Sequence, residues 1–259
     1  MKDIVLTLNI GNSHLLIGVW DSEDLVLRST ISTDLNRSAD EYAIQIHSIL
    51  ALHQISPQKI SGGILSSVVP ALTSCIREAL HQVCPVRFYT VGPGLKTGLS
   101  IRIDDPAQLG AELVCAAVAA LKDSPPPLII MTMDTAISIM AINQNRQLLG
   151  GAIFSSPTLS LEALIQKTAQ LSQVDLDVSL PSVIGSNTIS SMQSGSIFGT
   201  VCMLDGMLCR FKQELGETAS IIATGKIPSS ILNACVTPLK YDQNLILKGL
   251  YQIYQKNKR

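Results

Sequence analysis

The chain has 259 residues, which is enough for two domains of ordinary size or one large domain with a substantial core. Its formal net charge is −1 and its basic residues are scattered, so the sequence offers no footprint for nucleic acid or an anionic membrane. Because no run approaches about 18 apolar residues and the first residues lack a signal-peptide pattern, we expect a cytoplasmic protein that is neither exported nor membrane-spanning.

The first half of the chain alternates predicted strands and helices and begins with a β-hairpin. Apolar residues from Ile4 to Leu8 and from Leu15 to Val19 flank the turn formers Gly11-Asn12-Ser13, which predicts two antiparallel strands within residues 3–20. Beyond the hairpin, the apolar spacing predicts strands at 25–31, 60–69 and 87–91 and helices at 40–54, 71–83 and 106–121.

The run Ser124-Pro125-Pro126-Pro127 is the clearest break in the chain, because three prolines cannot continue a helix. We therefore divide the chain into halves at 1–124 and 125–259. Immediately after the break, residues 128–142 repeat the opening design, with an apolar strand, a small polar turn from Thr132 to Ala136 and a second apolar strand. This repetition indicates a duplication. The remaining pattern predicts strands at 147–150 and 220–223 and helices at 159–171, 188–215, 228–234 and 245–255.

Six cysteines lie along the chain without a CxxC pair, several of them in apolar helical stretches: Cys75, Cys84, Cys115, Cys202, Cys209 and Cys235. This usage is typical of reduced, buried thiols in a cytosolic protein and argues against a metal site. The hydrophobic fraction of 46% against 15% charged residues leaves two interpretations open, a large well-filled core or a buried subunit interface.

Two polar turns, one opening each half, are the candidate anion-binding elements. Their exposed backbone N–H groups would face each other across a cleft if a pseudo-twofold axis relates the halves. In the first turn, Gly11 can take a positive φ and Ser13 supplies a hydroxyl, although an ordinary hairpin turn would look the same. Glu112 begins a predicted helix, where it would serve either as a proton acceptor for a substrate hydroxyl or as a helix-capping acid.

Seven places along nearly the whole chain carry short motifs in a fixed order. They are Asn9-Ile10-Gly11-Asn12-Ser13, Ser66-Ser67-Val68-Val69-Pro70, Asp105-Pro106 through Leu109-Gly110-Ala111-Glu112 to Ala116-Ala117-Val118-Ala119-Ala120, Leu149-Gly150-Gly151-Ala152-Ile153, Asn187-Thr188 with Gln193-Ser194-Gly195, Ala223-Thr224-Gly225, and Leu245-Ile246-Leu247-Lys248-Gly249-Leu250. In this order and spacing the chain resembles the type III pantothenate kinases, the family that includes the Bvg accessory factor proteins.

The resemblance implies an α/β protein with the duplicated fold of actin, acetate kinase and the sugar kinases, a ribonuclease H-like fold with two similar halves around a nucleotide cleft. It also implies a homodimer. The reaction it implies is transfer of the ATP γ-phosphoryl group to the primary hydroxyl of pantothenate, the first step towards coenzyme A. The implied cofactors are ATP with Mg²⁺ and a monovalent cation, K⁺ or NH₄⁺.

The resemblance also implies roles for particular residues. The implied nucleotide-binding residues are Asn9, Ile10, Gly11, Asn12, Ser13, His14, Leu15, Leu16 and Thr135. The implied substrate-binding residues are Gly110, Ala111, Glu112, Leu113 and Thr188, with Thr188 at the dimer interface. Glu112 stands at the position of the catalytic base, and no residue is assigned as a direct protein ligand of a metal.

Several positions depart from the family pattern. Asn9 and Thr132 each replace an aspartate, and the aspartate at position 132 would bind the monovalent cation. Leu113 replaces an arginine beside the base. Glu112 replaces an aspartate, so the side chain of the base is one methylene longer. A shift of about 1 Å in the position of a catalytic group can cost roughly a hundredfold in rate. Further departures are Asp134 and Lys226 in place of glycines, Ser156-Pro157 in place of Pro-Gly, and Ile103 in place of tyrosine.

These departures leave three functional hypotheses open. The first is an active but divergent kinase with weakened metal and nucleotide binding. The second is a catalytically impaired paralogue that keeps the fold and the dimer and works as a binding or regulatory module. The third is another phosphoryl-transfer or nucleotide-hydrolysing activity on the same fold, since Leu113 and Ile103 would suit a less polar ligand.

Overall fold

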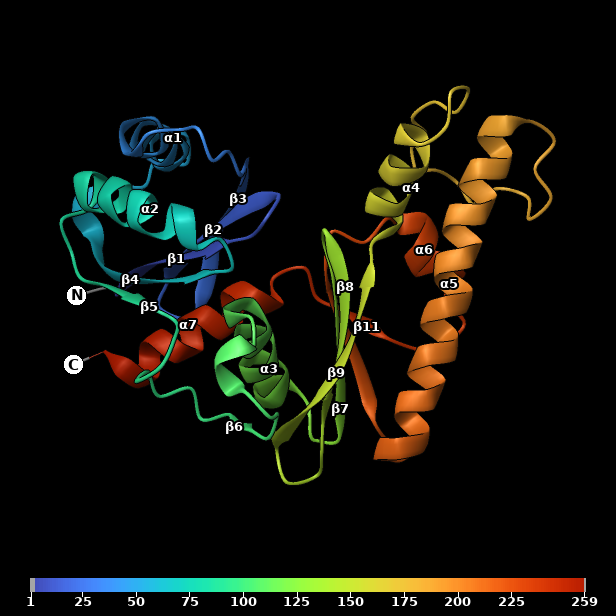
Figure 1. The fold of residues 1–259 in the computed structure, drawn as a ribbon. Coiled ribbons are helices and arrows are strands. Elements are labelled where there is room, and N and C mark those ends of the chain that lie inside the picture. The colour runs from blue at the N-terminus through green and yellow to red at the C-terminus, as the bar shows by residue number, and fades with distance from the viewer. Residues whose placement is uncertain (1–2, 259) are drawn as a thin grey trace. The chain divides into compact units, whose positions relative to one another are not determined.

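The computed structural model describes residues 3–258, which form two compact units (Figure 1). The first unit runs to residue 99 and adds 105–119 and the C-terminal segment from 244 onwards, whereas the second contains 100–104 and 120–243. By packing, the C-terminal helix therefore belongs with the first unit, although it follows the second in sequence.

The first unit is built on a five-stranded mixed sheet of order β3-β2-β1-β4-β5. Its strands are β1 (Ile4–Ile10), β2 (His14–Asp21), β3 (Asp24–Ser32), β4 (Ile60–Ser67) and β5 (Phe88–Thr90). The central strand β1 is antiparallel to β2, with Ile10 opposite Leu15, and parallel to β4, with Ile10 beside Ser67. The predicted opening hairpin is thus confirmed, and the strands β1 and β4 end at the same edge of the sheet.

Helices cover both faces of the first sheet. The helices α1 (Ala39–Leu52) and α2 (Pro70–Val83) bury their apolar side chains with those of β1 and β2 in one core. On the other face lies α7 (Leu245–Asn257), where Trp20 of β2 stacks on Tyr251 with ring centroids 4.6 Å apart. The unit also holds the short helices η1 (Pro57–Lys59) and η2 (Pro106–Gln108) and most of α3 (Ala111–Asp123).

The second unit contains a six-stranded sheet of order β11-β10-β7-β8-β9-β6. Its strands are β6 (Ser100–Ile101), β7 (Leu128–Met133), β8 (Ala136–Ile142), β9 (Gln147–Ser155), β10 (Ser220–Gly225) and β11 (Lys240–Tyr241). The helices α4 (Pro157–Gln166), α5 (Thr188–Leu215) and α6 (Ser229–Ala234) share a buried core with β7, β8 and β10.

The two sheets repeat one topology. Without β6, the second sheet reads β9-β8-β7-β10-β11, which matches β3-β2-β1-β4-β5 strand for strand. The directions match too, because β7 is antiparallel to β8 and parallel to β10, as β1 is to β2 and β4. The duplication indicated by the sequence is therefore present in the fold.

Several local expectations differ from the structure. The second polar turn is shorter than predicted, because Thr132 and Met133 remain in β7 and Ala136 begins β8. The predicted helix at 106–121 is divided into η2 and α3. The expectation of buried thiols is wrong for Cys202 and Cys209, which are exposed, since a helix of 28 residues packs only one side against its sheet. Within residues 3–258 no helix is both long and apolar enough to span a bilayer.

Gly249 of α7 allows a close approach to α3. A Cβ atom on Gly249 would lie 1.9 Å from the Cys115 carbonyl oxygen, whereas one on Gly206 of α5 would meet nothing within 4 Å. We expect Gly249→Ala to lower the free energy of unfolding by about 1–3 kcal/mol through overpacking. The control Gly206→Ala should raise it by roughly 0.5–1 kcal/mol through helix propensity. Urea unfolding of the two variants measures the difference, and equal stabilities would contradict the close packing of α7 on α3.

Candidate functional site

The first polar turn is a tight connection between β1 and β2. The Gly11 N–H donates to the His14 carbonyl oxygen at 2.9 Å, which closes the turn. Thr33, just after β3, holds it from the side, because its Oγ1 donates to the Gly11 carbonyl oxygen at 2.7 Å. Gly11 is buried, Asn12 is exposed, and Ser13 and His14 are half-buried. The turn therefore presents its tip to solvent and keeps its base in the core.

Asn9 lies one residue before the end of β1 and is only 6% exposed. Its neighbour on the parallel strand β4 is Ser66, whose Oγ donates to Asn9 Oδ1 at 2.7 Å. Ser66 is also hydrogen-bonded to Cys115 of α3. Burial raises the pKa of the Cys115 thiol to about 12, and the bond to Ser66 offsets that rise only in part, so the thiol stays protonated. A buried polar chain thus links β1, β4 and α3.

The start of α3 approaches the same edge of the sheet. The Val68 N–H, just after β4, donates to the Ile10 carbonyl oxygen at 3.0 Å. A Cβ atom on Gly110 would lie 3.6 Å from Val68 Cγ1, so the residue before α3 lies beside this connection. Glu112 is half-buried in the first turn of α3, where the helix dipole favours a carboxylate. Within the first unit, Val68 therefore lies beside both Ile10 at the end of β1 and Gly110 at the start of α3.

The predicted nucleotide-binding residues of the first hairpin differ in accessibility. The side chains of Ile10 and Leu15 are fully buried in the core, so any ligand would meet these residues only through their backbone. Leu16 is half-buried on β2, and Leu113 of α3 is 9% exposed. The residues able to present polar groups are therefore those of the turn itself, 11–14.

The second polar turn, in the second unit, is built differently. Thr132 of β7 lies beside Thr224 of β10, and both side chains are buried. Gly225 has a φ of 103°, and the Lys226 N–H donates to the Met133 carbonyl oxygen at 2.7 Å. The chain after β10 is thereby held against the end of β7. The exposed Asp134 closes the turn itself, since its N–H donates to the Ala136 carbonyl oxygen at 3.0 Å.

The chain around the second turn explains one departure from the family pattern. The Ser156 N–H donates to the Thr135 carbonyl oxygen at 3.3 Å. Ser156 is also the N-cap of α4, since its side chain accepts from the Leu159 N–H, and Pro157 occupies the first helical turn. Serine and proline are the residues that favour these two positions. The substitution of Pro-Gly by Ser156-Pro157 therefore begins a helix.

Thr188, the remaining predicted substrate residue, is the exposed first residue of α5. Asn187 caps this helix in a reciprocal arrangement with Ser190. Thr135 and Thr188 belong to the second unit, whereas residues 9–16 and 110–113 belong to the first. The roles of all these residues stay predictions. Ser66, Thr33 and Cys115 had no role predicted from the sequence, although Ser66 begins the motif Ser66-Ser67-Val68-Val69-Pro70.

The side chains around the first turn offer little to a metal ion by themselves. Among residues 3–258 no three His, Cys, Asp or Glu side chains come close enough to hold a metal ion together. Asn9 adds a neutral amide whose oxygen already accepts from Ser66. Mg²⁺ usually keeps several waters and binds one or two carboxylates together with substrate phosphates. The described residues therefore fit a Mg²⁺ ion carried by a nucleotide, and they do not fit an all-protein metal cage.

A family model described as type III pantothenate kinase matches residues 5–210. A type III pantothenate kinase of Citrifermentans bemidjiense is 38% identical over 255 residues, covering 98% of this chain and all of that protein. One from an Exiguobacterium species is 37% identical over 256 residues, covering 99% of this chain and all of that protein.

Solved structures show the same fold at low sequence identity. A Campylobacter jejuni protein described as a Baf family member superposes with a TM-score of 0.55 at 18% identity, covering 97% of each chain. A Sinorhizobium meliloti protein described as a 2-dehydro-3-deoxygalactonokinase gives a TM-score of 0.56 at 10% identity, covering 98% of this chain and 97% of its own. An archaeal actin homologue gives 0.51 at 10% identity, covering 98% of this chain and all of its own. The predicted duplicated actin-like α/β fold is confirmed.

Gly225 tests how tightly the chain after β10 is held against β7. A Cβ atom there would lie 2.1 Å from the Met133 carbonyl oxygen, whereas Gly216 has a similar φ of 110° and nothing within 4 Å. Alanine at either position costs about 1–3 kcal/mol for its backbone conformation. We expect Gly225→Ala to cost about 1–3 kcal/mol more than Gly216→Ala, because the backbone of β7 must also move. Thermal unfolding of both variants measures this difference, and equal losses would mean that the contact is not rigid.

Proposed function

This chain belongs to the type III pantothenate kinase family, and we propose that it transfers the γ-phosphoryl group of ATP to the primary hydroxyl of pantothenate. The observation that carries the proposal is the relationship to kinases of that name over nearly the full length of both chains, at 38% identity for the Citrifermentans bemidjiense protein. The position of Val68 beside both Ile10 and Gly110 supports it, because the start of α3 then lies at the sheet edge where the phosphate-binding turn begins.

The turn after β1 would hold the ATP phosphates through backbone N–H groups and the Ser13 hydroxyl. When bound with the nucleotide, Mg²⁺ would neutralise the negative charge on the phosphates. Glu112 would accept the proton of the pantothenate hydroxyl. The hydroxyl oxygen would then bond to the γ-phosphorus while the bond between that phosphorus and ADP breaks. Positioning and charge neutralisation supply most of the rate in such reactions.

The second unit would contribute two residues to ligand binding. We assign Thr135 to a second phosphate contact and Thr188 to pantothenate. The monovalent cation, K⁺ or NH₄⁺, would then find a hydroxyl at Thr132, where the family pattern has a carboxylate. Asp134 adds a negative charge at an exposed position, which makes a cation near the phosphates necessary because like charges would otherwise repel.

We also propose that the protein acts as a cytoplasmic homodimer at the first step of coenzyme A synthesis. The free state of all six thiols agrees with a reducing compartment. The second unit exposes large apolar side chains that a second copy would cover, among them Leu149, Ile153, Ile184 and Ile189. Ile189 follows Thr188 at the start of α5, so a dimer formed through this region would place Thr188 at the interface.

Replacing the proposed base tests the mechanism. Glu112→Gln keeps the shape of the side chain and removes its ability to take a proton, so we expect kcat to fall by roughly 10²–10⁴-fold with the thermal unfolding midpoint little changed. The control is Glu214→Gln, which makes the same change at an exposed position near the end of α5. Turnover of pantothenate by Glu112→Gln at the parent rate would remove Glu112 from the mechanism.

The substitution at position 9 can be tested by restoring the carboxylate. In Asn9→Asp the Ser66 hydroxyl can still donate to the side chain, and the added charge attracts Mg²⁺, so this variant should need a lower Mg²⁺ concentration for half-maximal activity. Asn145→Asp adds the same charge at an exposed turn and should leave the Mg²⁺ requirement unchanged.

The alternative function, an impaired paralogue, is tested by restoring four family residues together: Asn9→Asp, Leu113→Arg, Thr132→Asp and Asp134→Gly. If the parent does not phosphorylate pantothenate and this quadruple variant does, the chain is an impaired paralogue.

A further inference from the structure

Thr33 holds two carbonyl oxygens of the first polar turn. Its Oγ1 donates to the Gly11 oxygen at 2.7 Å, and its backbone N–H donates to the Ser13 oxygen at 2.9 Å. A trans peptide directs its carbonyl oxygen and the following N–H to opposite sides. The two bonds therefore turn the N–H groups of Asn12 and His14 away from Thr33.

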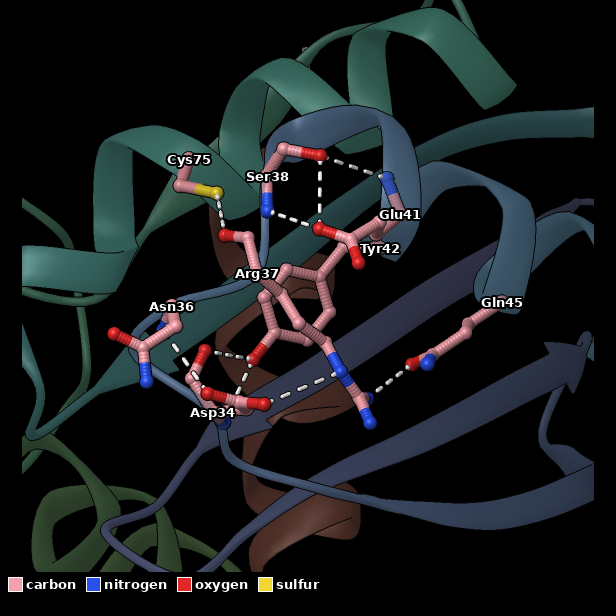
Figure 2. Close-up of polar contacts among 8 residues, drawn as sticks. All are labelled: Asp34, Asn36, Arg37, Ser38, Glu41, Tyr42, Gln45 and Cys75. Carbon is pink, nitrogen blue, oxygen red and sulfur yellow. Dashed lines mark hydrogen bonds and ion pairs between the residues drawn. The ribbon is translucent and has the colours of Figure 1, made fainter.

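The residue after Thr33 is fixed to the core by one phenol group. Tyr42 of α1 is fully buried, and its hydroxyl both accepts from the Asp34 N–H at 2.9 Å and donates to the Asp34 carbonyl oxygen at 2.8 Å. Figure 2 shows the Tyr42 ring reaching from the helix to the Asp34 backbone. Because the ring is rigid and packed in the core, it determines where the backbone next to Thr33 can lie.

The rest of the segment from residue 33 to residue 38 is held at several points, also drawn in Figure 2. The Asp34 carboxylate accepts from the Asn36 N–H at 3.0 Å and pairs with Arg37 at 3.6 Å. The Cys75 thiol of α2 contacts the Arg37 carbonyl oxygen at 3.6 Å. At the end of the segment, Ser38 and Glu41 form the capping box of α1. The segment is thus tied to two helices of the first unit.

We propose that residues 33–38 are a brace for the phosphate-binding turn, in which Thr33 is the positioning residue and Tyr42 its anchor in the core. The brace rests on the proposed function, because it orients the N–H groups of Asn12 and His14 towards the phosphates of ATP. Donors already held in the orientation that the bound ligand needs cost no ordering when it binds. Thr33 itself does not touch the reacting atoms.

The test compares the equilibrium dissociation constant for ATP with Mg²⁺, measured by titration calorimetry on the full chain. Thr33→Val removes the hydroxyl and keeps the shape, and we expect it to weaken ATP binding by roughly five- to tenfold, the equivalent of one hydrogen bond. Thr33→Ser keeps the hydroxyl and should bind within about twofold of the parent. Thr30→Val makes the same change at an exposed position on β3 and should leave ATP binding unchanged.

Hydrogen exchange in the unliganded protein gives a second measurement that does not depend on ATP. Thr33→Val and Tyr42→Phe should both speed the exchange of the backbone amides of residues 11–14, whereas Thr30→Val should not.

Parent-like ATP binding and exchange in Thr33→Val, or equally weak binding in Thr33→Ser, would overturn the brace. Failure of the parent to bind ATP would overturn it as well. If the parent binds ATP but does not phosphorylate pantothenate, the proposed function fails, while the binding comparison still decides for or against the brace.

Discussion

The hydrogen bond from Ser66 Oγ to Asn9 Oδ1 joins the ends of two parallel strands inside the first unit, and the candidate site depends on it. Both side chains are buried, and a buried polar group left without a partner costs about 1–3 kcal/mol. The bond therefore adds a buried side-chain link between β1 and β4 to their backbone pairing, close to where both strands leave the sheet. From that edge β1 passes into the polar turn, and β4 passes to Val68, beside the start of α3.

The second unit meets the same topological requirement with different chemistry. The strands β7 and β10 also run parallel and end together, but the paired residues are Thr132 and Thr224. A threonine hydroxyl is neutral and offers one donor and one acceptor oxygen on a shorter side chain than asparagine. Rigidity at this edge comes instead from Gly225, which can take a positive φ and lets the following chain bond to Met133. The two halves of the duplication thus share strand order and differ in the polar groups at their strand ends.

The fold was predictable from the sequence where the signal is local. The opening hairpin, the long helix at 188–215 and the repeated strand-turn-strand design all follow from apolar periodicity and turn residues. The second turn was placed too early because Thr132 is polar, although its side chain is buried on β7. The links from Ser66 to Asn9 and from Thr33 to Gly11 were not predictable, because they join residues 57 and 22 positions apart. Such contacts follow from strand order, which periodicity does not specify.

The neutral residue at position 9 also affects the stability of the first unit without a ligand. A carboxylate that is almost fully buried must pair with a cation or several donors, since its desolvation otherwise raises its pKa and destabilises the fold. An amide at the same place needs only hydrogen bonds, and its oxygen already has one from Ser66. The Cys115 thiol, protonated because burial raises its pKa to about 12, leaves the neighbouring helix neutral at that point as well. The polar chain from Asn9 to Cys115 is therefore neutral and needs no cation to balance it, whereas Glu112 at the start of α3 carries a carboxylate.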